Sequence, residues 1–402
     1  MATNKKNFPW FKNNPGLIYL DSGATSLKPQ IVIDEVVKYL SSESYNTHNL
    51  DSIETYKSKI AYDETKQLLA NYFNTNIQNI AYTFGATSSL NIIALGLEKL
   101  FENGGEIILS TIEHSSNILP FIELTKRTKA KIKYINSKEL FLTEKDILDS
   151  ITPETKIISF SNSSNLIGYK INAEKISLAI KKINPNILIS VDATQYAATK
   201  KMDLRNSGID FTVCGAHKML GPTGIGMLFV SDFALKIIEA RIVGGGMNLS
   251  IEKLSYRELP SIEKLESGTL NVEGIYGWRA ALKYYNSINQ LEEEKRLYDL
   301  KNYLELEMKK MNDYVIHNPN IKSNILIFSR KNVTGQDFVH YLDTEKIIAR
   351  SGLSCAKLIH ENIKVNDVVR ISMHFYTSKD DIEILISVLK KFKSGDEFNL
   401  LV

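Results

Sequence analysis

Short runs of apolar residues alternate with longer stretches of helical periodicity through the first two thirds of the chain. The helical stretches, such as residues 89–101 and 173–183, place apolar residues at i, i+3 and i+4 spacing, which is typical of helices with one buried face. The apolar runs between such stretches are short and continuous, and they cover residues 107–110, 157–160, 187–191, 211–213 and 227–230. Continuous apolar strands that alternate with helices predict an α/β fold with a mostly parallel sheet covered on both faces.

The pattern changes after about residue 263. Residues 272–311 read as a long helical region rich in Glu, Lys and Leu, and the remaining chain mixes strands with helices, the last helix beginning near Ser378. A chain of 402 residues is too long for one modest core, so we expect two domains. The expected division is a large domain over residues 20–265, a connecting segment over 266–289, and a smaller α+β domain built from 1–19 and 290–402.

Composition narrows the class of protein. Apolar residues make up 43% of the chain and the formal net charge is +3, as in an ordinary globular protein, and no dense basic stripe favours nucleic acid. The two cysteines, Cys214 and Cys355, exclude a disulfide scaffold in practice and favour a reducing compartment. We find neither the apolar core of a signal peptide nor an apolar stretch that could span a membrane. We therefore expect a cytoplasmic protein without a membrane, nucleic-acid or metal partner.

Residues whose side chains could bind a cofactor or transfer a proton follow three of the expected strands. Asp192, Lys218 and His114 each lie just after an apolar run, and ligand-binding residues gather at the carboxyl ends of parallel strands. Lysine is rarely buried unless it is paired or chemically used, and an apolar pocket makes its amino group lose a proton more easily. A lysine and a carboxylate at the ends of neighbouring strands suggest pyridoxal phosphate, whose aldehyde the lysine would hold and whose ring nitrogen the acid would hold.

Ten short motifs in a fixed order carry a resemblance to a known family. They are YLDSGATSLKP (19–29), GAT (85–87), EHSSN (113–117), SNLIG (164–168), VDATQ (191–195), AHKMLGPTGIG (216–226), GGGMN (244–248), ESGTLN (266–271), RSGLSCA (350–356) and VRISMHFYTS (369–378). In this order they resemble the class V aminotransferase family, and specifically the SufS-like cysteine desulfurases. The resemblance implies a homodimer of the pyridoxal-phosphate-dependent transferase fold type I.

The resemblance assigns roles around the cofactor ring. Lys218 would hold the cofactor aldehyde, Asp192 would keep the ring nitrogen protonated, and His114 would stack on the ring and relay protons. Gln195 and Asn165 resemble the residues near the phenolic oxygen of the ring, and Asn165 also lies near the substrate. The structural alternatives are a solvated lysine for Lys218, a helix N-cap for Asp192 and a purely structural histidine for His114.

A second set of residues resembles the phosphate ligands of the family. Thr87 and Ser88 begin a helical stretch, where free backbone N–H groups make an anion site. His217 resembles another phosphate ligand, and Thr269 resembles a donor supplied by the neighbouring subunit, which would make the sites composite. Simple helix capping is the alternative for each hydroxyl.

Cys355 decides between activities within the fold. It lies in a short polar loop, where a thiolate could attack a substrate sulfur and keep it as a persulfide, whereas Cys214 lies in an apolar run and reads as an inert core residue. Arg370 would bind the substrate carboxylate through a bidentate fork. Arg350 would support the loop or the substrate, with a surface ion pair as the alternative.

The resemblance implies a complete reaction with defined partners. L-cysteine would be split into L-alanine and a persulfide on Cys355, which an acceptor protein of the SufU or SufE kind, or a tRNA-thiolating enzyme, would collect for iron–sulfur cluster assembly or tRNA thiolation. Selenocysteine lyase activity, cysteine sulfinate desulfinase activity, or an inactive scaffold in a sulfur relay are the alternatives. One departure bears on the cofactor, because Gly215 stands where the family commonly has a phosphate-binding serine.

Overall fold

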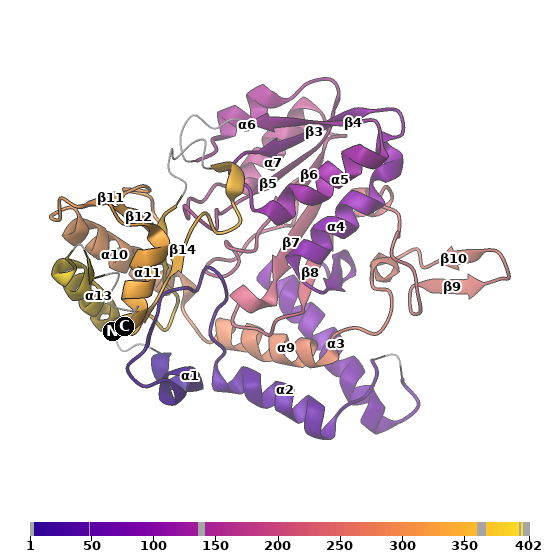
Figure 1. Cartoon of the computed structure of the whole chain (residues 1–402). Helices are drawn as coiled ribbons and strands as arrows, with labels where there is room; N and C mark the ends of the chain where they lie inside the picture. The colour runs from indigo at the N-terminus through magenta and orange to yellow at the C-terminus, as the bar shows by residue number, and fades with distance from the viewer. Residues whose placement is uncertain (1–3, 48, 136–140, 360–366, 394, 397–402) are drawn as a thin grey trace.

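A sheet of seven strands forms the centre of the larger part of the molecule in the computed structural model, which describes residues 4–47, 49–135, 141–359, 367–393 and 395–396 (Figure 1). Its strands are β2 (Ile80–Thr83), β3 (Gly105–Ser110), β4 (Ala130–Ile135), β5 (Thr155–Ser161), β6 (Leu188–Asp192), β7 (Phe211–Gly215) and β8 (Gly226–Val230). The spatial order is β2-β8-β7-β6-β5-β3-β4, and only β8 runs antiparallel to its neighbours. The expected mostly parallel α/β sheet is confirmed.

Helices cover both faces of this sheet, as the continuous apolar strands predict. Along β3, Ile107 and Leu109 pack into a cluster with α4 and α5, whereas Ile108 packs on the opposite face with α6 and α7. The helices of this part are α2 (Gln30–Ser42), α3 (Ile53–Tyr72), α4 (Ala86–Gly96), α5 (Leu119–Arg127), α6 (Glu144–Ser150), α7 (Ala173–Ile183), α8 (Asp232–Leu235) and α9 (Val272–Asn286). Short 3-10 turns join them: η2 (Ile77–Asn79), η3 (Glu98–Phe101), η4 (Ser115–Asn117), η5 (Ala216–Lys218) and η6 (Ile262–Leu265).

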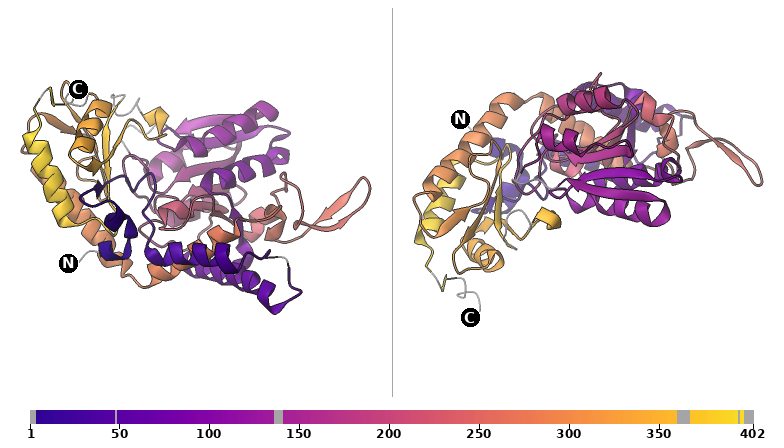
Figure 2. Two further views of the ribbon diagram at one scale, coloured as in Figure 1. Left: turned by 60° about the horizontal axis from the view of Figure 1, so that its bottom comes forward. Right: turned by 90° about the horizontal axis from the view of Figure 1, so that it is seen from above.

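A four-stranded antiparallel sheet forms the centre of the smaller part (Figure 2). Its order is β11-β12-β15-β14, from β11 (Tyr314–Ile316), β12 (Ile325–Arg330), β14 (Arg350–Ser351) and β15 (Val369–Ser372). The elements around it are α10 (Gln290–Met308), α11 (Gly335–Thr344), α13 (Lys379–Lys391) and the turn η7 (Lys357–Ile359). This arrangement fits the smaller α+β domain expected from the sequence, whose exact boundaries stay a prediction.

The N-terminal segment lies against the smaller part. It contains η1 (Asn4–Asn7), α1 (Pro9–Asn13) and β1 (Ile18–Tyr19), and β1 pairs in parallel with β13 (Ile347–Ile348). The Lys5 ammonium lies 2.5 Å from a carboxylate oxygen of Asp381 at the start of α13. Residues from the two ends of the chain therefore share one core.

The helical region over 272–311 is two helices, not one. Helix α9 ends with Ser287 as its C-cap, and Asn289 begins α10 by accepting a hydrogen bond from the backbone N–H of Glu292. Helix α9 packs against α2 and α3 beneath the large sheet (Figure 1). The capping asparagine marks the break, and the composition changes there from mostly apolar in α9 to rich in charged residues in α10.

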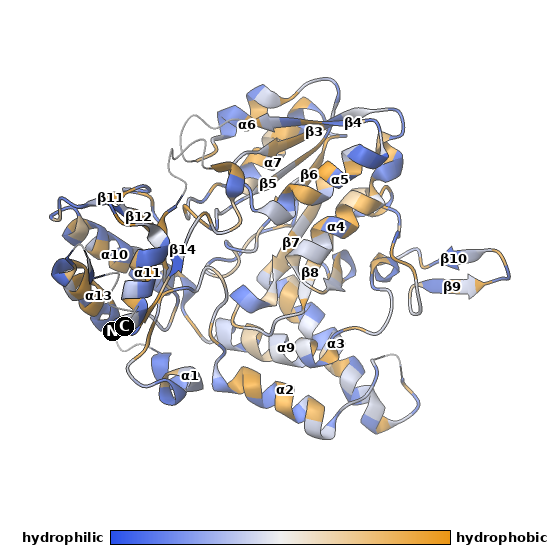
Figure 3. Ribbon diagram, viewed as in Figure 1, coloured by the Kyte–Doolittle hydropathy of each residue, from blue (hydrophilic) through white to orange (hydrophobic). Residues whose placement is uncertain are grey.

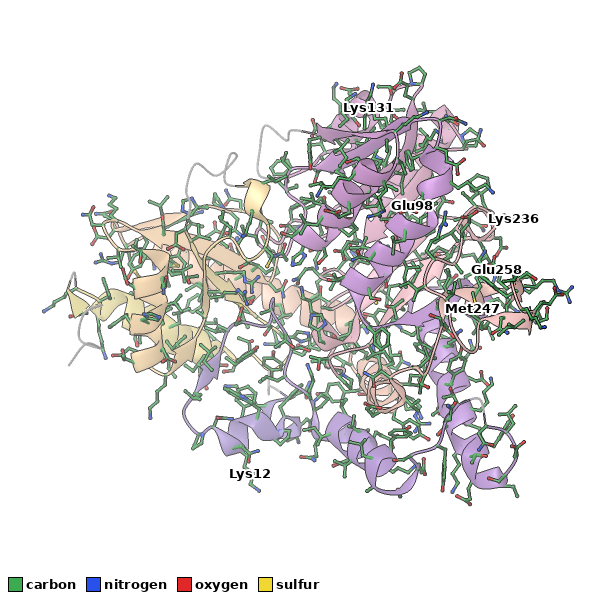
Figure 4. The ribbon with its side chains drawn as sticks, turned by 45° about the vertical axis from the view of Figure 1, so that its right-hand side comes forward. Lys12, Glu98, Lys131, Lys236, Met247 and Glu258 are labelled. Atoms are coloured by element: carbon green, nitrogen blue, oxygen red, sulfur yellow. The ribbon has the colours of Figure 1, made fainter. Side chains whose placement is uncertain are left out.

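A hairpin of β9 (Asn248–Ile251) and β10 (Tyr256–Glu258) projects from the larger part, away from the smaller one (Figure 2). Met247 and Glu258 mark its base in Figure 4, where Met247 is buried and its carbonyl accepts the N–H of Leu259. Figure 3 shows apolar residues along α2 as well as in the central strands. Among the helices of the described residues, none is both long and apolar enough to cross a membrane.

Candidate active site

A cavity of about 450 Å³ opens at the carboxyl ends of the parallel strands, between the larger and smaller parts of the molecule. All of the predicted site residues except Thr269 line it. They are Thr87, Ser88, His114, Asn165, Asp192, Gln195, His217, Lys218, Arg350, Cys355 and Arg370. Thr269 is exposed in the loop before α9 and lies outside this cavity. A larger cavity of about 570 Å³ lies elsewhere and contains none of these residues.

The amine and the carboxylate expected at the strand ends lie at two adjacent strands. Lys218 follows β7 in the turn η5, and Asp192 is the last residue of β6. Burial lowers the pKa of Lys218 to about 8, and the nearby Asp192 charge opposes this shift. One oxygen of Asp192 accepts the N–H of Thr194 at 2.9 Å, and no described residue donates to the other oxygen. That second oxygen is available to a ligand.

The tautomer of His114 follows from its contacts. Its Nδ1 accepts the backbone N–H of Ser116 at 3.1 Å, so the neutral ring carries its proton on Nε2. Burial, together with the charge of Lys218, lowers the pKa of His114, which keeps the ring neutral near pH 7. The neutral ring therefore has an N–H at Nε2 that can donate a hydrogen bond to a ligand.

The N-terminus of α4 forms an anion cradle at the edge of the cavity. The first helical hydrogen bond runs from the N–H of Ser89 to the carbonyl of Gly85, so the N–H groups of residues 86–88 have no helical acceptor. Gly85 has a φ of +140°, which favours glycine, and a Cβ on Gly226 would lie 2.6 Å from its Cα. These two glycines let the cradle close onto β8.

His217 occupies the space that a serine at position 215 would need. A Cβ on Gly215 would lie 2.9 Å from Nδ1 of His217. Burial lowers the pKa of His217 to about 4, with further lowering by the charges of Lys218 and Lys28, so the ring is neutral and keeps one N–H. Position 215 therefore has no hydroxyl, and the His217 imidazole fills the space that a side chain there would occupy.

Arg370 is deeply buried and lines the cavity. Its Nη2 donates to the Asp21 carboxylate at 2.6 Å, and its Nη1 donates to the carbonyl of Asn165 at 2.8 Å. Burial lowers the pKa of Arg370, and the Asp21 charge opposes that shift. Arg350 lies on the adjacent strand β14 with 44% of its side chain exposed, and its Nη1 is 4.0 Å from the other Asp21 oxygen. Two guanidinium groups therefore line the end that a substrate carboxylate would occupy.

The loop that carries Cys355 is held by two hydrogen-bonded contacts. Asn165 donates its side-chain amide to the carbonyl of Ser354 at 2.6 Å, and Ser115 donates both its N–H and its hydroxyl to the carbonyl of Cys355. Ser354 and Cys355 have φ values of +46° and +67°, a region that non-glycine residues rarely adopt. Cys355 is exposed, whereas Cys214 is buried and burial raises the pKa of its thiol. The expected contrast between the two thiols is confirmed.

Sequence reasoning missed three residues of this site. Asp21 pairs with Arg370, Ser115 holds the Cys355 loop, and Gly23 accepts the side-chain amide of Gln195 through its carbonyl at 2.9 Å. All three lie within the quoted motifs. Their roles depend on contacts between segments far apart in the chain, so motif membership was the only available signal.

The arrangement fits pyridoxal phosphate. Buried hydrogen-bonding atoms of Thr194, Ser354 and Arg370 line the cavity without a partner among the described residues, as expected of a site built around a polar ligand. The lysine amine suits the aldehyde, the second Asp192 oxygen suits a ring N–H, and the N-terminus of α4 suits a phosphate.

Comparisons with known proteins agree with this geometry. The aminotransferase class-V family model matches residues 18–385. A protein of Ureaplasma parvum named probable cysteine desulfurase is 41% identical over 99% of this chain and 99% of that protein. A Borreliella burgdorferi protein of the same name is 36% identical over 96% of this chain and 95% of its own length.

Two solved structures have the same fold throughout. The apo cysteine desulfurase of Thermococcus onnurineus matches with a TM-score of 0.91 at 25% identity, covering 97% of this chain and 98% of that one. The cysteine desulfurase CsdA of Escherichia coli matches with a TM-score of 0.89 at 26% identity, covering 99% of this chain and 98% of that one.

Proposed function

The chain belongs to the class V aminotransferase family, and on this basis we propose that it takes sulfur from L-cysteine and holds it as a persulfide on Cys355. The family match and the relatives confirm the cysteine desulfurase activity and the pyridoxal phosphate cofactor that the motifs implied. The observation that carries the assignment of Cys355 is its position. An exposed thiol on a fixed loop lines the same cavity as Lys218 and Arg370.

Several residues of the cavity have defined tasks in the proposed reaction. Bound pyridoxal phosphate supplies an electron sink for the Cα of the amino acid. Lys218 holds the cofactor, and its pKa of about 8 lets its Nζ take a proton from the substrate and return it near neutral pH. Arg370 binds the carboxylate of L-cysteine, and Asp192 and the N-terminus of α4 hold the two ends of the cofactor.

The sulfur transfer balances within the cavity. The Cys355 thiolate attacks the sulfur of L-cysteine, so that an S–S bond forms while the Cβ–S bond of the substrate breaks. The electron pair of the broken bond stays on the substrate carbon, which takes a proton from the Lys218 ammonium. L-cysteine and the Cys355 thiol thus become L-alanine and the Cys355 persulfide, with no outside oxidant or reductant.

The persulfide then needs an acceptor that comes to it. Ser115 and Asn165 hold the carbonyls of Cys355 and Ser354, so the loop is fixed at the cavity. We propose that a protein of the SufU or SufE kind, or a tRNA-thiolating enzyme, reaches in and removes the sulfur. Iron–sulfur cluster assembly in the cytoplasm is the use we favour.

A homodimer is the proposed assembly. Helices α2 and α3 expose apolar side chains, among them Leu40 at 60% and Ile53 at 87%, and such patches mark contact surfaces in many proteins. Thr269 is exposed and outside its own cavity, as a donor to a neighbouring subunit would be.

The test compares the two cysteines. We expect Cys355→Ala to lose sulfide release from L-cysteine by at least about 100-fold, because the attacking thiolate is absent, while its cofactor absorbance is unchanged. Cys214→Ala is the matched control and should keep turnover, since Cys214 is buried and does not line the cavity. Alanine and sulfide are measured with a reductant present. Full turnover by Cys355→Ala would exclude the persulfide, and a cofactor-loaded protein that makes no alanine would exclude the proposed function.

A further inference from the structure

A second cavity lies between the larger and smaller parts of the molecule, outside the active site. Its volume is about 570 Å³, and none of the residues that line it also lines the active-site cavity. Its walls are residues 169–171 and 199–200 of the larger part, one side of α10, and residues 321–324 before β12. Small-molecule sites in proteins have volumes of roughly 300–1,000 Å³, so this cavity has the size of a ligand site.

The walls of this second cavity are held by contacts between segments far apart in the chain. A Cβ on Gly168 would lie 1.9 Å from Oγ of Ser323, so the backbone beside the cavity packs directly against the 321–324 segment. Asn318 donates its side-chain amide to the carbonyl of Ile167 at 2.8 Å and so joins the same two segments. The cavity is therefore formed without a ligand, as most small-molecule sites are.

Part of the lining is apolar. Leu142 and Leu297 are buried, and Ile171 and Ile321 are half-buried and pack against the same core cluster. The side chain of Tyr298 adds an aromatic ring to the lining. Side chains of this kind bind the hydrocarbon or aromatic body of a ligand, because burial removes that body from water.

Lysines give the same cavity a positive charge. Its described lining residues include four lysines and one carboxylate, namely Lys170, Lys200, Lys295, Lys322 and Glu294. Four positive charges and one negative charge leave a local net charge of +3, which equals the formal net charge of the whole chain. The lysines are therefore concentrated at this cavity and do not reflect a basic composition.

Three of these lysines have no carboxylate partner among the described residues. Glu294 pairs with Lys170 at 2.5 Å, which leaves Lys200, Lys295 and Lys322 uncompensated. These three come from separate segments of the chain, so they do not form a charged stripe along one helix. Burial lowers the pKa of Lys170, Glu294 opposes this shift, and the nearby charge of Lys200 adds to it. Like charges held this close repel each other, and an anion between them removes the repulsion.

We propose that this second cavity binds a phosphate ester with an apolar or aromatic body. A phosphate ester carries up to two negative charges near neutral pH and has three acceptor oxygens, so it suits three uncompensated ammonium groups better than a carboxylate does. Lysine binds phosphate in many proteins as a point charge. The apolar lining holds the rest of the ligand. Because the two cavities share no lining residue, such a ligand binds with the cofactor and substrate in place.

The first experiment compares three probes on the cofactor-loaded protein by titration calorimetry. Naphthyl phosphate has both an aromatic body and a phosphate, naphthol lacks the phosphate, and inorganic phosphate lacks the aromatic body. We expect one molecule of naphthyl phosphate to bind per chain. Its affinity should be at least about tenfold higher than that of either other probe, because each of those makes only part of the contacts.

Lysine variants locate the bound probe. We expect the double variant Lys295→Gln/Lys322→Gln to bind naphthyl phosphate about tenfold more weakly, at roughly threefold for each exposed charge pair that is lost. Lys236→Gln is the matched control, because Lys236 at the end of α8 is exposed and does not line the cavity. Its affinity for the probe should equal that of the wild type. All three side chains are exposed, so the variants should fold.

Three results would overturn the proposal. Absence of naphthyl phosphate binding would exclude the site, and equally tight binding of naphthol or inorganic phosphate would exclude the ligand chemistry. A double variant that binds the probe as Lys236→Gln does would place the probe elsewhere on the protein. Turnover of L-cysteine, measured in the same preparations, should be unchanged in every variant and shows that the active site is intact.

Discussion

At the scale of the residue, the surroundings of a side chain decide its chemistry more than its type does. Cys214 and Cys355 are the same residue, but one is buried in β7 with its pKa raised and the other is exposed beside the cavity. His114 and His217 both have lowered pKa values, yet one is held through Nδ1 and the other fills the space beside Gly215. A replacement at position 215 therefore tests whether that packing matters.

We expect Gly215→Ser to weaken cofactor binding, although it restores the residue common in the family. The new Cβ would lie 2.9 Å from Nδ1 and 3.0 Å from Cε1 of His217, so the ring must leave its present position in the cavity. Overpacking of this kind costs about 1–3 kcal/mol, which corresponds to an affinity loss of roughly 5-fold to 150-fold. The dissociation constant of pyridoxal phosphate from the apo protein measures it.

Gly245→Ser is the matched control for this change. A Cβ at Gly245 has nothing within 4 Å, so the affinity for pyridoxal phosphate should stay at the wild-type value. Tighter binding by Gly215→Ser would show instead that the missing hydroxyl, and not the position of His217, limits the cofactor site.

At the scale of the element, local sequence patterns predict the positions of strands and helices well, but they do not predict whether a strand runs parallel or antiparallel to its neighbours. The apolar runs at 157–160 and 227–230 became β5 and β8, and the periodic stretch 173–183 became α7. The antiparallel direction of β8 was not predictable, because an apolar run reads the same in either orientation and pairing depends on the rest of the sheet. The break between α9 and α10 was missed, although Asn289 is a capping residue and the composition changes there from mostly apolar in α9 to rich in charged residues in α10.

We expect Ser115→Ala to slow persulfide formation while leaving the cofactor bound. Its hydroxyl donates to the carbonyl of Cys355 at 2.7 Å, and this bond helps to keep Ser354 and Cys355 in the left-handed backbone region. One such bond contributes about 0.5–1.5 kcal/mol, so the rate of persulfide formation on Cys355 in a single turnover should fall roughly 2–10-fold. Mass spectrometry of the intact protein follows the added sulfur.

Ser287→Ala serves as the control for a lost serine hydroxyl. Ser287 donates to a backbone carbonyl at 2.7 Å in the same way, but it lies between α9 and α10 and not among the residues of the cavity. If both variants form the persulfide equally slowly, the cause is general destabilisation. That result would contradict a role for the hydrogen bond from Ser115 to the Cys355 carbonyl.

At the scale of the whole molecule, the site joins segments from both ends of the chain. Asp21 lies beside the first strand and Arg370 on the last strand, and between them in the sequence come Asp192 at the end of β6 and Lys218 just after β7. The sequence located the residues at strand ends, since each follows an apolar run. It did not locate the partners of those residues, such as Asp21 for Arg370, because such contacts exist only after the two parts of the molecule have packed together.

The same argument extends to a second copy of the chain through Thr269. If Thr269 completes the cavity of a neighbouring subunit, Thr269→Ala should weaken cofactor binding by about 10-fold or more, the scale expected for a hydrogen bond to a charged phosphate. Lys218→Ala should lose activity entirely. Mixing the two variants and allowing subunits to exchange should restore one intact site per heterodimer, with Lys218 from one chain and Thr269 from the other. The measurement is alanine formation at limiting cofactor, which should be recovered in this mixture. The control is a mixture of Lys218→Ala with Asp192→Ala, which should form no alanine. Lys218 and Asp192 of one site come from the same chain, so no heterodimer of these two variants has an intact site. A mixture no more active than Thr269→Ala alone would mean that the sites are not shared between subunits.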